Sequence, residues 1–510
     1  MLKKIGKVSS ILKLGIIYSW EKYHFLIPPK ELARGIKKVT ANLSTIDKYE
    51  MWIKNNEKVL EYKTFEYNPL ISIVIPHYNT NSQYLKECIE SVLNQSYRNF
   101  ELCIADDCST NEESINILKK YEEEYSQIKV VWRKENGNIS AATNSAIEIA
   151  QGEYIAFMDS DDVLHKDALY WNVEALNKNR RIELIYSDED KLDFDGNRVL
   201  PHFKPDWNPD LLLSLNYICH FVVAKANLVK ELGGCRSEFD GAQDYDFLLR
   251  LTEKTNNIHH IPKMLYHWRI LLGSTALSES GKPYIIEAWE NVIKEALKRR
   301  NLKGTLIPSA HKPFHILFEN NNEKVTIFVS VDNRNKLKNC LESIYKRTTY
   351  KNFEIILINE SNKKIIKYDN LPVVKTFEEA IKMATGEYIV LLSGNVEIVT
   401  SNWIEFMLGY ARQERIGFVG GNVDDKVPNL KENWYDNLDI SNEALVTGYR
   451  NFVTCNYDCI DLMCCMISKD KFSGISKELP VCKEGLNSEY KNIYFPVVKV
   501  ALHRDEEDLC

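Results

Sequence analysis

The 510-residue sequence lacks a long hydrophobic run, since no window holds the ~18 uninterrupted apolar residues that a membrane-spanning helix needs. The best candidate, residues 211–226, is broken by Asn216 and His220. No small-residue cleavage site follows the lysine-containing N-terminus, so a secretory signal peptide is not expected. These absences predict a cytoplasmic chain.

The 12 cysteines lack paired spacing over most of the chain, which is typical of reduced thiols in a cytosol. The cluster Cys455, Cys459, Cys464 and Cys465 has neither the short two-residue spacing nor the nearby histidine of a zinc knuckle. We interpret these four residues as buried thiols. A formal net charge of −7 gives no argument for nucleic acid as a partner.

The first 68 residues are polar and predict a mostly helical segment. Ile5, Val8, Leu12 and Ile16 fall on one helical face, with lysines nearby. Such a face fits peripheral contact with the anionic inner surface of the cell membrane, or a helix packed on its own protein. The pattern alone leaves both interpretations open.

Strand and helix patterns alternate after this segment, which favours an α/β layer with a parallel sheet. Short apolar runs predict strands at 70–76, 100–107, 128–132 and 153–159. Ligands of such sheets bind outside the carboxyl ends of the strands. Five acids fall at these ends: Asp106, Asp107, Asp159, Asp161 and Asp162.

The region after residue 180 changes character. We expect a hairpin that turns at Asp195-Gly196, a helix within 242–254, a strand within 261–269 and a closing helix at about 283–301. The helix carries acids in its first turn, where the helix dipole favours negative charge.

The pattern of residues 71–109 then returns at 325–362, as a repeat of domain length. Shared anchors include Leu85 with Leu337 and Cys88 with Cys340. "GEYI" also occurs twice, at 152–155 and 386–389. The acids are not retained: Asp106, Asp107, Asp159, Ser160 and Asp161 correspond to Asn359, Glu360, Ser393, Gly394 and Asn395.

Two carboxylates one residue apart after a strand, Asp159 and Asp161, point the same way if the segment is extended, so both can address one hard cation. Without a cation or hydrogen-bond donors, carboxylates this close repel each other. "FMDSDDV" also fits the pattern of haloacid-dehalogenase-type phosphatases. That fold places the motif on its first strand, whereas here it follows the fourth.

Several longer stretches resemble family 2 glycosyltransferases, which are inverting enzymes of the GT-A fold that build bacterial surface polysaccharides. They are "SIVIPHYN", "GNISAATNSAIEIAQGEYIAFMDSDD", "KPDWNPDLLLSLNY", "GAQDYDFLLRLTEK" and "HIPKMLYHWR". The resemblance implies two tandem GT-A (Rossmann-like) domains after the N-terminal helical segment. We expect boundaries at 1–68, 69–312 for the catalytic domain and 323–510 for a degenerate transferase-like domain.

The resemblance also implies a site for a nucleoside-diphosphate sugar. Pro76, Tyr78 and Asn79 would border the base and ribose, and Asp107 would accept the imide N–H of uracil or thymine. Asn138 and Asn144 would line the nucleotide pocket, and Gly233 and Gly234 would let backbone approach the sugar or acceptor. The remaining expected substrate-binding residues are Asp159, Ser160, Gln243 and Arg269.

The same resemblance implies a catalytic base and a divalent cation, Mn²⁺ or Mg²⁺. Asp161, His267 and Asp159 are the expected metal ligands, so that charge neutralisation stabilises the departing nucleoside diphosphate. Asp244 is the expected base that takes the proton from the acceptor hydroxyl. Asp246 is the competing candidate, but it points elsewhere on the helix.

These expectations describe an inverting, metal-dependent, rhamnosyltransferase-like enzyme of capsule, O-antigen or cell-wall synthesis. Its donor is UDP- or dTDP-linked, its acceptor is a saccharide or lipid-linked saccharide, and a homo-oligomer is possible. The alternative is a non-catalytic carbohydrate-binding scaffold. For the second copy, three roles stay open: holding an acceptor chain or dimer partner, metal-free transfer, or stabilisation of the first domain.

Overall fold

The structure is a computed structural model. It describes residues 48–271, 283–308, 314–331, 333–359, 370–423, 454–457, 462–474 and 491–502. The chain forms two compact units, of which the first holds most residues up to 296 and the second most of the rest, together with 208–215. No helix in the described ranges is long and apolar enough to cross a bilayer. The predicted amphipathic face from Ile5 to Ile16 lies outside the described residues.

The described part of the N-terminal segment packs on the first unit. Residues 48–56 form a helix, and the chain from 57 to 70 has no regular secondary structure. Tyr49 is buried and its hydroxyl donates to Asp190 at 2.5 Å. Glu57 accepts two hydrogen bonds from Arg198, at 2.6 and 2.7 Å.

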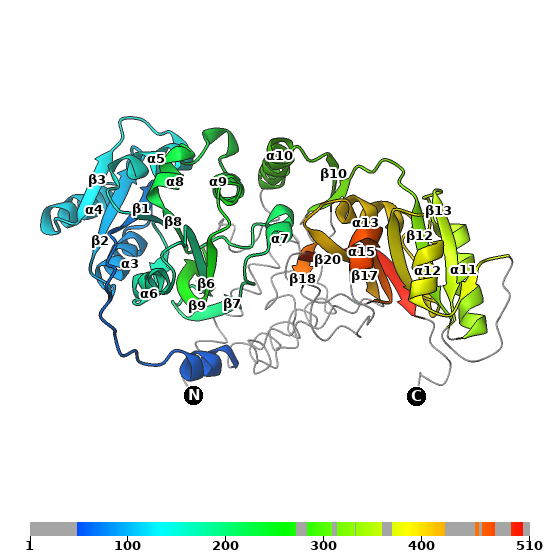
Figure 1. The fold of residues 1–510 in the computed structure, drawn as a ribbon. Coiled ribbons are helices and arrows are strands. Elements are labelled where there is room, and N and C mark those ends of the chain that lie inside the picture. The colour runs from blue at the N-terminus through cyan, green and yellow to red at the C-terminus, as the bar shows by residue number, and fades with distance from the viewer. Residues whose placement is uncertain are drawn as a thin grey trace, which may run out of the picture. The chain divides into compact units, whose positions relative to one another are not determined.

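The first unit is built on one mixed sheet with the strand order β3-β2-β1-β4-β8-β6-β9-β5, and β7 pairs with β6 (Figure 1). The strands are β1 (Ile71–His77), β2 (Phe100–Asp106), β3 (Ile128–Trp132), β4 (Tyr154–Phe157), β5 (Val163–Leu164), β6 (Leu184–Leu192), β7 (Arg198–His202), β8 (Val222–Lys225) and β9 (Ile258–Arg269). The first four pair in parallel, as predicted, whereas β8 runs antiparallel to β4. The hairpin predicted at Asp195-Gly196 joins β6 to β7, with Gly196 at φ 78°.

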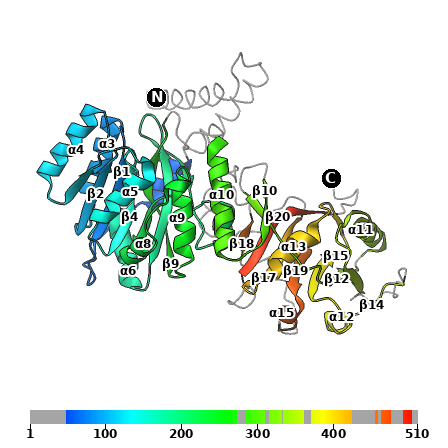
Figure 2. The ribbon, with the colours of Figure 1, turned by 90° about the horizontal axis from the view of Figure 1, so that it is seen from above.

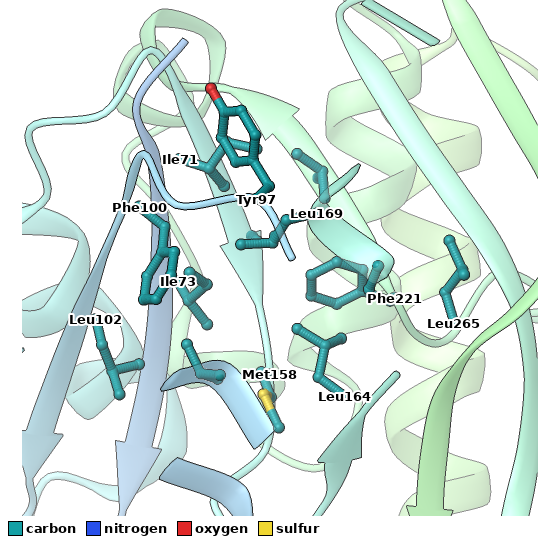
Figure 3. Close-up of a cluster of buried hydrophobic side chains, with 14 of the residues drawn as sticks. Ile71, Ile73, Tyr97, Phe100, Leu102, Met158, Leu164, Leu169, Phe221 and Leu265 are labelled. Atoms are coloured by element: carbon teal, nitrogen blue, oxygen red, sulfur yellow. The ribbon is translucent and has the colours of Figure 1, made fainter. Parts of the chain in front are cut away.

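Helices between the strands cover this sheet (Figure 2). They are α3 (Ser82–Leu93), α4 (Glu112–Glu124), α5 (Asn138–Ile149), α6 (Ala168–Lys178), α8 (Ala226–Glu231) and α9 (Gln243–Thr252). The helix α10 (Pro283–Arg299) follows the last strand, β9. Large apolar side chains such as Ile73, Leu102 and Phe221 fill the core (Figure 3). Each such side chain contributes about 1.5–3 kcal/mol when fully buried. This core fixes the strand ends that carry the acids.

The second unit repeats the sheet with the order β14-β13-β12-β15-β19-β17-β20-β16, and β18 pairs with β20. Its strands are β12 (Val325–Ser330), β13 (Phe353–Ile358), β14 (Val373–Val374), β15 (Tyr388–Ser393), β16 (Val396–Ile398), β17 (Ile416–Val423), β18 (Cys455–Tyr457), β19 (Cys464–Ser468) and β20 (Lys491–Leu502). Its other elements are the hairpin β10 (Gly304–Pro308) and β11 (Phe314–Phe318), with helices α7 (Pro209–Ser214), α11 (Arg334–Arg347), α12 (Phe377–Met383), α13 (Trp403–Ala411) and α15 (Lys469–Gly474). The sheet order confirms that the sequence repeat is a structural repeat.

The shared "GEYI" has a structural cause in both copies. A Cβ on Gly152 would lie 2.7 Å from the Leu70 carbonyl oxygen, and one on Gly386 would lie 2.6 Å from the Thr326 amide nitrogen. The Gly152 N–H donates to the Ser72 hydroxyl at 2.8 Å, and Gly386 donates to the Thr326 hydroxyl at 2.9 Å. Only glycine allows this close approach of the strand to its neighbour.

Candidate active site

The predicted acids come together at one edge of the first sheet. Strand β1 pairs in parallel with both β2 and β4, so the residues that follow these strands share the carboxyl edge. His77 lies opposite Asp106, and its Nδ1 is 2.8 Å from an Asp106 carboxylate oxygen. Asp107 follows β2, and Asp159 follows β4.

The acids after β4 lie on a turn, not on the extended segment that the sequence suggested. The turn is closed by the Asp162 N–H, which donates to the Asp159 carbonyl oxygen at 3.4 Å. Because of this turn, it is Asp162 whose carboxylate joins Asp159 in a group of potential metal ligands, with ligand atoms within 4.8 Å of one another. Burial and the charge of Asp159 raise the pKa of Asp161 to about 6.

Two residues of β9 brace this turn. The Tyr266 hydroxyl donates to Asp162 at 2.6 Å and accepts from the Asp159 N–H at 3.1 Å. Arg269 donates its Nε–H to the Asp161 carbonyl oxygen at 2.7 Å and its backbone N–H to Asp162 at 2.7 Å. The predicted substrate-binding residue Arg269 is therefore engaged by the turn, with a further bond to Glu87 at 2.6 Å.

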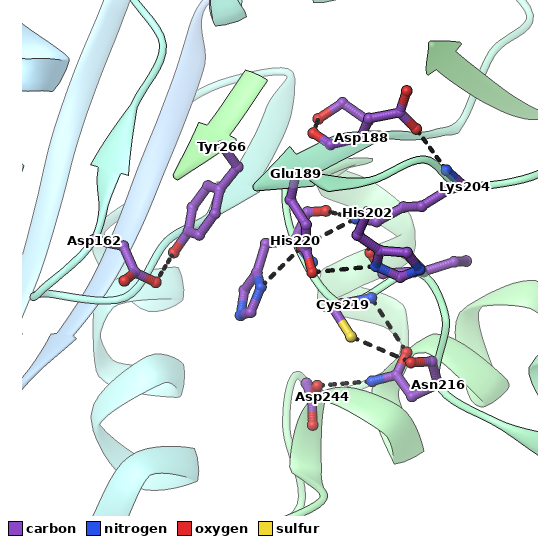
Figure 4. Close-up of polar contacts among 12 residues, drawn as sticks. Asp162, Asp188, Glu189, His202, Lys204, Asn216, Cys219, His220, Asp244 and Tyr266 are labelled. Carbon is purple, nitrogen blue, oxygen red and sulfur yellow. Dashed lines mark hydrogen bonds and ion pairs between the residues drawn. The ribbon is translucent and has the colours of Figure 1, made fainter. Parts of the chain in front are cut away.

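His220 completes the group of potential metal ligands with Asp159 and Asp162. Its Nε2 lies 3.8 Å from an Asp159 oxygen, and its Nδ1 lies 3.2 Å from Glu189 (Figure 4). Burial opposes its protonation, but the hydrogen bond and charge of Glu189 and the charges of both aspartates outweigh burial and raise the pKa of His220 to about 9. Its ring stacks on Tyr266, with centroids 4.7 Å apart.

The predicted base, Asp244, lies in the first turn of α9 with an exposed side chain. Asn216 donates its amide N–H to the Asp244 carboxylate at 2.8 Å (Figure 4). Solvent reaches the carboxylate, yet protein surrounds enough of it that desolvation raises its pKa, with an opposing effect of His220 and a smaller raising effect of Asp159. His220, one of the group of potential metal ligands, thus acts on the charge of Asp244. The competitor Asp246 is buried and bound by Arg236 and Arg250.

Asp107 is buried and already holds two donors. Its carboxylate accepts from the Arg133 Nε–H at 2.7 Å and from the Gly137 N–H at 3.0 Å. The carboxylate keeps free lone pairs, because each oxygen can accept two hydrogen bonds. Exposed Asn138, at φ 64°, follows Gly137 at the start of α5.

Asn144 fixes the double-glycine loop. Its amide donates to the Cys235 carbonyl oxygen and accepts from the Cys235 N–H, both at 2.8 Å. Gly234 has φ 71°, and a Cβ there would lie 2.1 Å from the Asn144 oxygen. Gly233 has φ 72° and no atom within 4 Å of an added Cβ, so space remains beside it.

The other expected substrate-binding residues line the same edge. Pro76 lies at the end of β1 opposite Ala105, and Tyr78 is 53% exposed. Asn79 has φ 49° and accepts from the Thr110 and Asn111 N–H groups. The Ser160 hydroxyl lies 2.6 Å from the Thr80 hydroxyl, and the Gln243 side chain accepts a hydrogen bond from the Gly241 N–H at 2.8 Å.

Among the described residues, His267 is not part of the group of converging ligand atoms. Its Nδ1 lies 2.5 Å from a carboxylate oxygen of Asp190, which is itself held by Tyr49 and Arg198. The sheet pairing also identifies the residue of the second unit that corresponds to His267. Val163 pairs with His267, and the corresponding pair in the repeat is Glu397 with Ala501, so Ala501 takes the position of His267.

Sequence reasoning missed His220, Asn216 and Glu189 as site residues. Asn216 and His220 are among the polar residues that interrupt the apolar run 211–226. Polar side chains inside such a run need partners when buried, so the interruption was the available signal. Glu189 pairs with buried Lys204 at 3.0 Å and gave no comparable signal.

The ligand chemistry fits a divalent cation. Carboxylates suit Mg²⁺ and Mn²⁺, while an added imidazole is accepted more readily by transition metals than by Mg²⁺. Within the described ranges, the group of Asp159, Asp162 and His220 is the one set of three such side chains with converging ligand atoms. A cation there would displace the His220 proton, because metal ligation needs the neutral ring.

The fold and the site together indicate the class of protein. Both units are α/β domains of the GT-A type, and the acidic edge of the first lies where that fold binds its ligands. Residues 72–231 match the family Glycosyl transferase family 2. An uncharacterized glycosyltransferase of Methanocaldococcus jannaschii is 31% identical over 207 residues, which cover 40% of this chain and 71% of that protein. The chain belongs to glycosyltransferase family 2.

Longer relatives match across both units. An uncharacterized protein of Sinorhizobium fredii is 39% identical over 385 residues, covering 70% of this chain and 42% of that protein. The O-antigen biosynthesis protein RfbC of Myxococcus xanthus is 31% identical over 373 residues, covering 69% and 29%. This chain thus spans less than half the length of either relative. The solved structure of S. aureus TarS residues 1–349 in complex with UDP-GlcNAc matches with a TM-score of 0.38 and 23% identity, over 44% of this chain and 66% of that one.

Proposed function

We propose that the first unit transfers a sugar from a UDP- or dTDP-linked donor to a saccharide acceptor in bacterial surface polysaccharide synthesis, with inversion at the anomeric carbon. The observation that carries this proposal is the group of Asp159, Asp162 and His220 in the first unit, together with the exposed carboxylate of Asp244 that Asn216 holds at 2.8 Å. Family membership and the O-antigen biosynthesis relative support it. The phosphatase alternative has no support from these relatives.

The proposed chemistry is a single displacement. The acceptor oxygen forms a bond to the anomeric carbon as the bond to the diphosphate oxygen breaks, and the acceptor proton passes to Asp244. In-line attack needs base and leaving group on opposite sides of the reacting carbon. Asn216 donates to Asp244 and orients its carboxylate, and desolvation raises the pKa of Asp244, which makes the carboxylate a stronger base.

We further propose that the acidic turn holds Mn²⁺ or Mg²⁺ beside the diphosphate. Such a cation supplies charge neutralisation for the leaving nucleoside diphosphate. Two imidazoles compete as its nitrogen ligand, the expected His267 and His220. The geometry favours His220, because its Nε2 lies 3.8 Å from Asp159 and its ligand atoms converge with those of Asp159 and Asp162. The contact of each histidine with a carboxylate, Asp190 for His267 and Glu189 for His220, does not separate them.

Nucleotide-sugar turnover tests the proposal directly. UDP-hexoses, UDP-N-acetylhexosamines and dTDP-rhamnose would be incubated with saccharide acceptors, with and without Mn²⁺ or Mg²⁺, and release of nucleoside diphosphate would be measured. Release that requires both acceptor and metal supports the transferase. Saccharide binding without release from any donor would favour the carbohydrate-binding scaffold. His220→Ala and His267→Ala then separate the two candidate ligands by the metal dependence of UDP binding.

A further inference from the structure

A buried ion pair lies beside His220 in the first unit. The side chains of Glu189 and Lys204 are 4% and 0% exposed, and the Lys204 ammonium donates to a Glu189 carboxylate oxygen at 3.0 Å. Burial of two charges costs free energy, and replacement of such a pair by apolar side chains often leaves a fold no less stable. Stability alone thus does not account for the pair.

The ammonium of Lys204 makes all of its hydrogen bonds to the protein around His220. It has three N–H donors, and it donates to Glu189 and to the carbonyl oxygens of Ile218, at 2.6 Å, and of His220. Because these bonds use all three donors, Lys204 holds the loop that carries His220 rather than a ligand.

Glu189 contacts the same histidine at two further atoms. Its carboxylate accepts from the His220 backbone N–H at 3.1 Å and lies 3.2 Å from the ring Nδ1 (Figure 4). The His220 ring also stacks on Tyr266, with 7° between the planes, and its centroid lies 5.2 Å from that of Trp268. The backbone N–H, the backbone carbonyl, Nδ1 and the ring of His220 are therefore all held by neighbouring groups.

The remaining polar atom of His220 is Nε2, which lies 3.8 Å from a carboxylate oxygen of Asp159. An ionised carboxylate only accepts hydrogen bonds, so the contact with Glu189 places a proton on Nδ1. A neutral ring with that proton has its lone pair on Nε2, the atom that lies near Asp159. Histidines that bind metals commonly donate their second ring nitrogen to a carboxylate, which fixes the direction of the ring.

The sheet explains why Glu189, and not the next residue of the chain, contacts His220. Glu189 pairs with Tyr266 in the register of β6 and β9, and Asp190 pairs with His267. Successive side chains of a strand point to opposite faces of a sheet. Glu189 and Tyr266 therefore share one face, where both contact His220. Asp190 and His267 share the opposite face.

We propose that Glu189 and Lys204 are positioning residues that hold His220 so that its Nε2 faces the acidic turn. Lys204 fixes the carbonyl oxygens of the loop, and Glu189 fixes the backbone N–H and the ring. The inference rests on the proposed function, because it needs a divalent cation held by Asp159, Asp162 and His220. It makes the Mn²⁺ affinity of the site depend on two residues that are not themselves ligands.

The test measures Mn²⁺ binding to the full chain by calorimetry, in the presence of UDP or dTDP. Glu189→Gln keeps the size of the side chain but removes the charge that pairs with Lys204, and we expect Mn²⁺ to bind at least about tenfold more weakly. Glu101→Gln is the matched control. Glu101 is a buried carboxylate at the amino end of β2 that accepts from Lys129 at 2.6 Å. This variant should bind Mn²⁺ within about twofold of the wild type.

A spectroscopic readout separates positioning from a general loss of stability. Pulsed electron paramagnetic resonance of the bound Mn²⁺ should show coupling to an imidazole nitrogen in the wild type and in Glu101→Gln. The coupling should disappear in His220→Ala and fall in Glu189→Gln. Glu189→Leu combined with Lys204→Met covers the case in which the single variant does not fold, because it removes both charges together. The double variant should also lose the coupling.

Two results would overturn the proposal. One is a Glu189→Gln variant whose Mn²⁺ affinity and nitrogen coupling equal those of Glu101→Gln, and the other is a wild-type spectrum without a coupling that depends on His220. The proposed function fails separately, if the wild-type chain releases no nucleoside diphosphate from any donor. Loss of the coupling in Glu189→Gln would then still support the positioning of His220.

Discussion

The ends of β4 and β15 show how two copies of one sheet differ. After β4, a turn with three acids is braced by Tyr266 and Arg269. After β15, the Gly394 N–H donates to the carbonyl oxygen of Ser330 at 3.0 Å, and a Cβ on Gly394 would lie 2.4 Å from that oxygen. The second turn is thus drawn onto the end of β12. The two copies share the sheet, whereas the three acids of the turn after β4 have no equivalents after β15.

The repeated part is a set of hydrogen bonds rather than a sequence signature. Glu101 accepts from the Ser72 hydroxyl at 2.5 Å, and Glu354 accepts from the Thr326 hydroxyl at 2.7 Å. Cys88 and Cys340 each donate to the carbonyl oxygen of the residue that opens the turn. Beyond these bonds, Asp159 is replaced by Ser393.

The largest effect should come from the base. Asp244→Asn removes the group that takes the acceptor proton, so we expect kcat to fall about 10²–10⁴-fold. UDP binding by calorimetry should be unchanged, because the residue does not hold the nucleotide. Transfer near the wild-type rate would remove Asp244 from this role.

The next effect compares the two turns directly. Asp159→Ala should weaken Mn²⁺-dependent UDP binding at least about tenfold, which corresponds to ~1.4 kcal/mol, because Asp159 belongs to the group of potential metal ligands. The matched substitution in the second copy, Ser393→Ala, should leave that binding unchanged. Calorimetry with both variants checks this, and equal losses would contradict the assignment of the cation to the first turn.

A smaller effect concerns the turn after β15, where Gly394 approaches the Ser330 carbonyl oxygen. Gly394→Ser, which installs the residue of the first copy, forces a side chain against the Ser330 carbonyl oxygen. We expect it to destabilise the second unit by about 1–3 kcal/mol. The reverse change, Ser160→Gly, loses only the contact with Thr80 and should cost less. Thermal unfolding measures the loss of stability in each variant. A larger loss for Ser160→Gly than for Gly394→Ser would show that the close approach of Gly394 to Ser330 does not constrain the second turn.

The smallest effect is a pH dependence of stability. Burial opposes ionisation of Glu354, but hydrogen bonds from Thr326, Thr385 and Lys324 outweigh it and lower its pKa from 4.5 to about 2. A carboxylate with a lowered pKa stabilises the fold above its unfolded pKa, so this stability is lost as pH falls from 4.5 to about 2. Glu354→Gln should flatten the stability curve of the second unit in that window. An unchanged slope in denaturant titrations at several pH values would show that the bonds do not favour the charged form.

Much of the fold could be predicted from sequence. The strands at β1, β2 and β4, the β6–β7 hairpin and the helices α9 and α10 follow from local apolar patterns and turn residues. The antiparallel strands inserted beside β4 could not be predicted, because pairing partners depend on contacts distant in sequence. The allocation of 208–215 to the second unit was hidden for the same reason.

The site was predictable where residues sit at strand ends. Asp107, Asp159 and Asp244 lie at the sheet edge or helix start that their patterns indicated. The turn after β4 altered which carboxylates converge, since one hydrogen bond between Asp159 and Asp162 changes the direction of the side chains. The contact of Glu189 with His220 joins positions 31 apart, and no local pattern reports such a pair.

The central claim is that the first copy binds and turns over the donor, whereas the second copy has kept the sheet without the acidic turn. The most direct measurement is the stoichiometry of Mn²⁺-dependent UDP or dTDP binding to the full chain by calorimetry. The account predicts one site per chain, abolished by Asp159→Ala and retained in Ser393→Ala. Two sites per chain, or one site that survives Asp159→Ala and disappears in Ser393→Ala, would contradict it.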